Sequence, residues 1–200
     1  MSGSILDRWG ISAEELTEVI DQNPSLRGIM LGYVAEMKIR QMWFSPPKVD
    51  SSHKPDDHDR AEKCDLLVTY RGEPFRVEVK SAQTNSIRRS QGRITARFQC
   101  DASDRRKVVL PNGKSVNTTC LLIDEFDIVA VNLHAFNERW EFAFARNRDL
   151  PRSTHKGYTA YQRKHLLASL VPISLPLDPP FRSEPFSLMD EIIRERKGKG

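Results

Sequence analysis

Two alternating segments in the middle of the chain, joined by a turn sequence, limit its possible folds most. Residues 65–70 and 75–80 are rich in β-branched, leucine and aromatic side chains, and residues 71–74 between them read Arg-Gly-Glu-Pro. Such segments around turn-forming residues predict a β-hairpin whose apolar residues share one side. With a four-residue turn, the expected pairs are Tyr70 with Phe75, Val68 with Val77, Leu66 with Val79 and Asp65 with Lys80.

The other side of this hairpin carries three ionisable residues. Asp65 faces Lys80 in the expected register, and Glu78 lies on the same side because residues two apart on a strand point in one direction. Two further Glu-x-Lys sequences, at residues 36–38 and 195–197, lie in predicted helices, where such a pair is turned by about 200°. The strand copy is therefore the candidate site.

Chemically, this trio suits metal-assisted hydrolysis of a phosphodiester. Two carboxylates a few ångströms apart repel each other unless a divalent cation lies between them, so Asp65 and Glu78 predict a Mg²⁺ site in which Mn²⁺ can substitute. Such an ion neutralises a scissile phosphate, and Lys80 could orient or deprotonate the attacking water. The alternative is an ordinary cross-strand ion pair between Asp65 and Lys80 on an exposed sheet face.

Helices are predicted before and after the hairpin. A capping box at Ser12 starts one helix, and Asn23-Pro24 ends it and opens a longer one to about Trp43. Residues 161–170 favour a short helix. Along the long helix the helical period of the apolar residues predicts packing against a core. These residues are Leu26, Ile29, Met30, Tyr33, Val34 and Met37.

Further strands are predicted after the hairpin. Residues 93–99 alternate between apolar and polar or basic side chains, which predicts a strand of the same sheet with one basic face. Residues 108–114 resemble a small hairpin around an Asn-Gly turn. Residues 126–133 are an almost continuous apolar run, as expected for a central strand covered on both faces, and residues 140–144 predict its neighbour.

The motif resembles the PD-(D/E)XK nuclease superfamily. The likeness covers residues 26 to 144 and rests on Asp65 and on the Glu-Val-Lys strand thirteen residues later, preceded by a helix. It implies an α/β fold with a restriction-endonuclease-like core, in which a central mixed β-sheet contains an antiparallel catalytic hairpin and is flanked by α-helices. It also implies that Asp65, Glu78 and the main-chain carbonyl of Val79 bind the metal, and that Lys80 assists the water.

Two acids near the motif have alternative interpretations. The family pattern has a proline before its first acid, whereas Cys64 precedes Asp65 here and a literal Pro-Asp pair stands at residues 55–56. The spacing favours Asp65, because the other acid lies in a segment without strand pattern. The resemblance makes Glu36 on the preceding helix a further catalytic candidate, although an i,i+4 pair with Arg40 is the alternative.

Positive charge is concentrated after the hairpin. The formal net charge is only +4, yet residues 81–120 contain eight basic and two acidic side chains. Such a patch is the usual electrostatic footprint of a polyanion site, with a solvated charged face as the alternative. The expected DNA-binding residues are Gln83, from the resemblance, and Arg88, Arg89, Arg93, Arg97, Arg105, Arg106, Lys107 and Lys114. We expect the arginine pairs at 88–89 and 105–106 to point to solvent.

The length of 200 residues fits one domain with an arm. Residues 1–170 are expected to form the nuclease domain, with an exposed loop at 45–63 and a basic DNA-facing insertion at 81–120. Residues 171–200 are expected to form a Pro-rich arm without regular structure up to Ser187, the N-cap of a last helix, packed on the domain or on a partner. No apolar run approaches the roughly 20 residues that span a bilayer, which predicts a cytoplasmic protein without membrane partner.

These features predict a Mg²⁺-dependent endonuclease that hydrolyses double-stranded DNA, of the type II restriction or phage-defence kind. One alternative is a structure-specific nuclease for junction resolution or repair, and another is a non-catalytic DNA-binding protein on a nuclease scaffold. Because one active centre cuts one strand, cutting both strands of a symmetric site predicts a homodimer. Its expected interface includes residues 175–186 and the helix after Ser187, whose apolar content exceeds what a simple tail needs.

Overall fold

The computed structural model describes residues 3–55 and 64–198 and divides the chain into two compact units, residues 1–34 and 35–200. The first unit contains α1 (Ile5–Trp9), α2 (Ala13–Gln22) and the first half of α3 (Pro24–Met42). A capping box begins α2 as predicted, since the Ser12 hydroxyl accepts a hydrogen bond from Glu15 N–H at 3.1 Å. The short helix α1 was not expected from the sequence.

The long helix α3 buries a different face from the one that its apolar period predicts. Ile29, Tyr33 and Met37 are exposed, and the exposed fraction of Ile29 is 59%. The buried residues of α3 are Ala35 and Ile39, one turn apart in the half that belongs to the second unit. The prediction of a core-facing stripe from Leu26 to Met37 is therefore wrong, since Leu26, Met30 and Val34 are only half-buried and the other three residues of the stripe are exposed.

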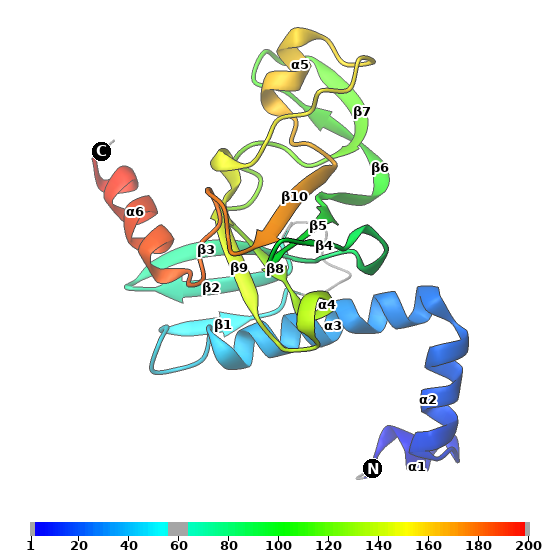
Figure 1. Ribbon diagram of the computed structural model, residues 1–200. Helices are drawn as coiled ribbons and strands as arrows, with labels where there is room; N and C mark the ends of the chain where they lie inside the picture. Colours follow the sequence, from blue (N-terminus) through cyan, green and yellow to red (C-terminus); the bar gives the residue numbers. More distant parts are fainter. Residues whose placement is uncertain (1–2, 56–63, 199–200) are drawn as a thin grey trace. The chain divides into compact units, whose positions relative to one another are not determined.

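The second unit is a mixed α/β structure around a five-stranded mixed sheet (Figure 1). The strand order is β1 (Ser51–His53), β2 (Leu66–Tyr70), β3 (Glu73–Ser81), β8 (Ile128–Asn132) and β9 (Phe142–Arg146). Strands β3 and β8 run parallel and the other neighbours run antiparallel. Every residue of β8 is buried, and β9 is its neighbour, so both predictions for this pair are confirmed.

The predicted hairpin exists with a shorter turn. Leu66 pairs with Val77 and Tyr70 pairs with Glu73, so the expected register is wrong by two residues. Arg71 and Gly72 both adopt positive φ, at 52° and 75°, which makes a two-residue turn of the kind that fits twisted strands. A shift of two residues leaves each side chain on its own side of the hairpin, because the side-chain period of a strand is also two.

Part of the expected loop at 45–63 is ordered into the sheet. Strand β1 pairs with β2, and Val49 just before it is buried. Asp50 accepts a hydrogen bond from Gly72 N–H at 2.8 Å, which ties this segment to the hairpin turn. The expectation of an exposed loop without buried residues is wrong for these residues, and Asp56 lies outside the described ones.

A second sheet contains β10 (Leu170–Leu175), β5 (Arg93–Gln99) and β4 (Arg88–Ser90) in that order. Strand β5 alternates as predicted, but it belongs to this separate sheet, which meets the end of β3 at a bridge between Ala82 and Phe98. Strand β10 contains Pro172, contrary to the expectation of no regular structure there. It lies at the sheet edge, where a missing N–H costs no ladder hydrogen bond.

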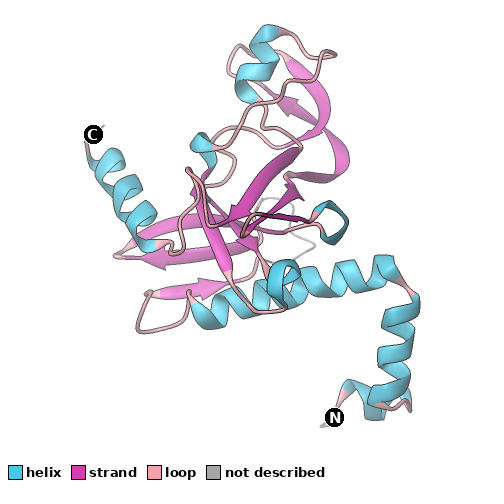
Figure 2. Ribbon diagram, in the orientation of Figure 1, coloured by secondary structure: helices cyan, strands magenta, loops and turns pink. Residues whose placement is uncertain are grey.

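A two-stranded ribbon of β6 (Asp101–Val109) and β7 (Ser115–Cys120) follows β5. It confirms the hairpin around the Asn-Gly turn and is longer than predicted. The short helices are η1 (Thr84–Ser86), α4 (His134–Asn137), η2 (Asn147–Asp149) and α5 (Ala160–His165), and the last helix is α6 (Phe186–Lys197). Figure 2 shows the distribution of helix and strand. In the described part of the chain, no helix has both the length and the apolar composition for crossing a membrane.

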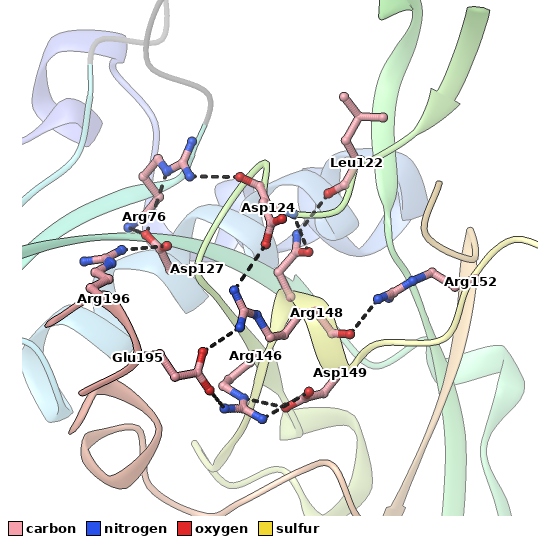
Figure 3. Close-up of polar contacts among 11 residues, drawn as sticks. Arg76, Leu122, Asp124, Asp127, Arg146, Arg148, Asp149, Arg152, Glu195 and Arg196 are labelled. Carbon is pink, nitrogen blue, oxygen red and sulfur yellow. Dashed lines mark hydrogen bonds and ion pairs between the residues drawn. The ribbon is translucent and has the colours of Figure 1, made fainter. Parts of the chain in front are cut away.

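Helix α6 packs on its own unit. Leu188, Met189 and Ile193 are buried in the same apolar cluster as residues of β2 and β3. The Glu184 carboxylate, rather than Ser187, caps the helix, because it accepts hydrogen bonds from Phe186 N–H at 2.7 Å and Ser187 N–H at 3.1 Å. Arginine–carboxylate contacts also join α6 to the sheet (Figure 3), including one between Arg146 and Glu195 at 2.9 Å.

Candidate functional site

Strand β3 presents Glu78 and Lys80 on the side opposite its apolar residues. The Lys80 Nζ to Glu78 Oε1 distance is 2.6 Å, and the two side chains are 21% and 12% exposed. Phe75 and Val77 on the same strand are fully buried on the other side. The strand spacing thus brings the two groups together as predicted, on a strand that is hydrogen-bonded to neighbours on both edges.

Asp65 lies directly before β2 and contacts the same strand. Its Oδ2 accepts a hydrogen bond from Val79 N–H at 2.7 Å. In the observed register Leu66 pairs with Val77, so the position of Asp65 is opposite Glu78 rather than Lys80. In the observed register the two carboxylates are therefore closer along the sheet than predicted. Asp65 is hydrogen-bonded to the backbone between Glu78 and Lys80.

The electrostatics of this group reflect burial and repulsion between two acids. Burial raises the pKa of Glu78 to about 7, the charge of Lys80 opposes that rise, and repulsion from Asp65 adds to it. Burial by itself would lower the pKa of Lys80, but attraction by Glu78 and Asp65 outweighs it and raises that pKa. Lys80 therefore stays protonated, and one lysine faces two carboxylates.

Two neighbours of the site were missed in the sequence. The charge of Glu125 contributes to the raised pKa of Glu78, and Glu125 forms an ion pair with Arg106 at 2.5 Å. Burial raises the pKa of the Cys100 thiol to about 12, while the charge of Lys80 opposes that rise. Neither residue belongs to a periodic sequence pattern that indicates the site. Each lies near the site only because of the tertiary fold.

Glu36 is engaged on the long helix by a cation from another segment. Lys54, just after β1, contacts Glu36 Oε2 at 2.9 Å. This ion pair gives Glu36 a role in attaching the β1 segment to α3. Its participation in the site stays a prediction, as does the metal ligation by the Val79 carbonyl.

The basic residues of 81–120 differ in their contacts and in their exposure. Arg106 is half-buried against Glu125, so the expectation that it points to solvent is wrong. Arg88 donates to the Ile87 carbonyl at 2.8 Å, Arg89 to the Phe136 carbonyl, and Arg93 to Asp178. The exposed basic residues are Arg88, Arg89, Arg97, Arg105, Lys107 and Lys114, so Arg106 is the one exception in the two arginine pairs.

Gln83 lies beside the basic face of β5. Its backbone N–H donates to the Arg97 carbonyl at 2.8 Å, and its side-chain amide lies 3.5 Å from that of Gln99. The polar residue that follows the Glu-Val-Lys strand therefore extends the polar surface of β5. Gln83 and Arg97 thus lie together where the end of β3 meets β5.

The donor set of the site fits a hard divalent cation. Among residues 3–55 and 64–198, no group of three or more His, Cys, Asp or Glu side chains is arranged to hold a metal. The carboxylates that meet at the site, those of Asp65 and Glu78, are both oxygen donors. Mg²⁺ commonly binds through one or two carboxylates and completes its shell with water and substrate phosphate.

No family model and no curated protein matches the chain. Among solved structures, the chain is similar to a bacterial homing endonuclease, I-Ssp6803I, with 18% sequence identity and a TM-score of 0.37. That match covers 88% of this chain and 95% of the other. A TM-score at this level does not establish a shared fold, so the functional argument depends on the residues of the site.

Proposed function

We propose that the protein is a Mg²⁺-dependent endonuclease that hydrolyses phosphodiester bonds of double-stranded DNA, on a restriction-endonuclease-like core. The observation that carries this proposal is the juxtaposition of Asp65, Glu78 and Lys80 on one strand pair. Two acids share a mostly buried position beside one cation, with Lys80 Nζ 2.6 Å from Glu78 Oε1 and Asp65 fixed to Val79 N–H at 2.7 Å. Repulsion from Asp65 contributes to the raised pKa of Glu78, and a bound divalent cation relieves that repulsion.

Each side chain has a separate task. Asp65 and Glu78 supply carboxylate oxygens for the ion, which when bound neutralises the scissile phosphate and lowers the pKa of a water. Lys80 orients the attacking water or donates a hydrogen bond to a phosphate oxygen, and in the metal-free protein the neighbouring acids raise its pKa. The buried side of β3 holds both groups in place during the reaction.

DNA is the substrate class that the surrounding charge favours. The exposed cations Arg97, Arg105 and Lys114 all follow β3 in sequence, and each phosphate that they neutralise releases counterions. We assign a restriction or phage-defence role, with two copies acting on one symmetric site. Because α6 is buried on its own unit, the dimer interface includes surfaces other than the buried face of that helix.

The experiment that tests the proposal is cleavage of supercoiled plasmid with Mg²⁺, with Mn²⁺ and with EDTA. The expected result is nicked or linear product with either metal and none with EDTA. Asp65→Asn should abolish cleavage, whereas Asp56→Asn, the acid of the literal Pro-Asp pair, is the matched control and should remain active. The assignment of Asp65 is wrong if these two results are reversed.

A second arm separates the restriction role from a structure-specific one. Defined linear duplexes and four-way junctions are incubated with the protein under the same conditions. Preferential cleavage of the duplex supports the restriction role, and preferential cleavage of the junction contradicts it. Sedimentation with DNA in Ca²⁺ measures the stoichiometry, for which we expect two protein chains on one duplex.

A further inference from the structure

The ribbon of β6 and β7 has two faces of different character. On one face Arg106 pairs with Thr118 and Val108 with Val116, and all four are buried or half-buried. On the opposite face Lys107 pairs with Asn117 and Val109 with Ser115. All four of these are exposed, and the exposed fraction of Val109 is 65%.

The inner face fixes the ribbon to the body of the second unit. Arg106 forms its ion pair with Glu125 at 2.5 Å, and Glu125 also accepts a hydrogen bond from Leu122 N–H at 2.8 Å. The Thr118 hydroxyl lies 2.6 Å from the Tyr158 hydroxyl in the segment before α5. The outer face is therefore presented on a supported frame, rather than on a free hairpin.

The root of the ribbon, where β6 begins at Asp101, lies beside the candidate site. Phe98, three residues before β6 begins, forms a bridge with Ala82, which lies two residues after Lys80. The inner-face contact of Arg106 with Glu125 thus connects the ribbon to the surroundings of the site.

The outer face has the composition of a surface that reads bases. A two-stranded antiparallel ribbon fits the major groove, where lysine recognises guanine O6 and N7, asparagine recognises adenine N6 and N7, and an apolar group contacts the thymine methyl. Lys107, Asn117 and Val109 supply these three chemistries on one face. In the described part of the chain, neither Lys107 nor Asn117 has a side-chain hydrogen bond or ion pair.

The same composition argues against a face that only binds phosphate. Asn117, Ser115 and Val109 carry no charge and add nothing to counterion release, which is the source of sequence-independent affinity. We infer that the β6–β7 ribbon enters the major groove and that Lys107 and Asn117 read base edges there, so that this ribbon sets sequence preference. This inference rests on the proposed DNA endonuclease function.

The geometry also limits where the bases that are read can lie. Lys107 is six residues after Asp101 along β6, and a strand rises about 3.3 Å per residue, so the two are at most about 20 Å apart. Base pairs follow each other at about 3.4 Å along the duplex. The base pairs contacted by Lys107 and Asn117 should therefore lie within about six steps of the root of the ribbon, and so near the cut.

The test selects bound duplexes from a randomised pool in Ca²⁺ and sequences cleavage sites in Mg²⁺. For Asn117→Ala and Lys107→Ala we expect preference to relax at one or two base pairs near the cut, by about 5- to 150-fold, with binding to other sequences retained. Lys114→Ala, in the turn, is the matched control and should weaken binding equally for all sequences. Asn117→Arg should shift the preference from adenine to guanine.

The outcomes separate this inference from the proposed function. The ribbon assignment alone is overturned if the wild type cleaves DNA and both ribbon variants keep its sequence preference. It is also overturned if the variants lose affinity equally for all sequences and show a smaller salt slope. A wild type that neither binds nor cuts DNA overturns both. Thermal melting of each variant controls for folding, and a folded Asn117→Arg protein with the wild-type preference also overturns the ribbon assignment.

Discussion

Two clusters of charged residues in the second unit differ in balance. The site on β3 has two acids, Asp65 and Glu78, around one lysine. The network beside β9 and α6 pairs each acid with an arginine (Figure 3): Asp127 contacts Arg196 at 2.8 Å, and Glu195 contacts Arg146 and Arg148 at 2.9 and 2.5 Å. Both clusters are partly buried, so burial alone does not distinguish them.

The difference indicates that the network stabilises the fold, whereas the site on β3 destabilises it. In the network the Asp149 carboxylate accepts hydrogen bonds from Arg146 and raises the pKa of that guanidinium, so partners reinforce each other. At the site burial and a like charge raise the pKa of Glu78 to about 7. A buried acid that is not fully compensated destabilises the protein, and a ligand cation recovers that energy.

The largest expected effect distinguishes the two clusters by activity. Glu78→Gln removes one of the two carboxylates that we propose hold the ion, and it should lower the cleavage rate by several orders of magnitude. Its fold should persist, because the amide relieves the repulsion by Asp65. Cleavage kinetics and thermal melting of the same preparation check both statements, and an active Glu78→Gln enzyme would contradict the assignment of the site.

A smaller loss of activity is expected at the cation of the site. Lys80→Met keeps the aliphatic length and removes the donor that orients the attacking water. Its rate should fall by about 100- to 10,000-fold, the usual range for a group that takes part in proton transfer or orients it. Measured Mg²⁺ affinity should be retained, since the two carboxylates remain; a rate equal to that of the wild type would make Lys80 only an ion-pair partner.

The third prediction applies the same isosteric change to the network. Asp127 is 15% exposed, close to the 12% of Glu78, and it accepts hydrogen bonds from Arg76 N–H and Arg196 at 2.8 Å each. Asp127→Asn should destabilise the protein by about 1–3 kcal/mol, because it weakens charge-assisted bonds in a partly buried position. Chemical denaturation measures this loss, and cleavage at a temperature where the variant is folded should be unchanged.

The sequence predicted the placement of Glu78 and Lys80 better than it predicted the elements around them. Period-two alternation placed Glu78 and Lys80 on one side, and that conclusion survived a register error because the error was an even number of residues. The turn was misjudged since Arg71 takes a positive φ that its residue type rarely adopts. Glu125 was missed because a single acid in a loop has no periodicity.

The sheet assignments failed for a different reason. The alternation of β5 is the same whichever sheet the strand joins, so the pattern could not distinguish an extension of the main sheet from the second sheet that β10 completes. The proline in β10 misled the prediction because sheet edges tolerate it. Likewise, the apolar period of α3 described a helix but not which of its turns meet the core.

The last prediction is a pH dependence of the stability of the metal-free protein. In the folded state Glu78 keeps its proton until about pH 7, whereas an unfolded glutamate loses it near 4.5. Between these values the folded state binds more protons, so this group contributes stability that is complete below pH 4.5 and is lost as the pH rises through 7. The loss is at most about 3 kcal/mol.

In EDTA, the melting temperature of the wild type relative to Glu78→Gln should therefore fall between pH 5 and pH 8. Mg²⁺ added at pH 8 should raise the melting temperature of the wild type only. Parallel pH profiles for the two proteins would show that Glu78 is compensated like the acids of the network, which would remove the distinction between the two clusters.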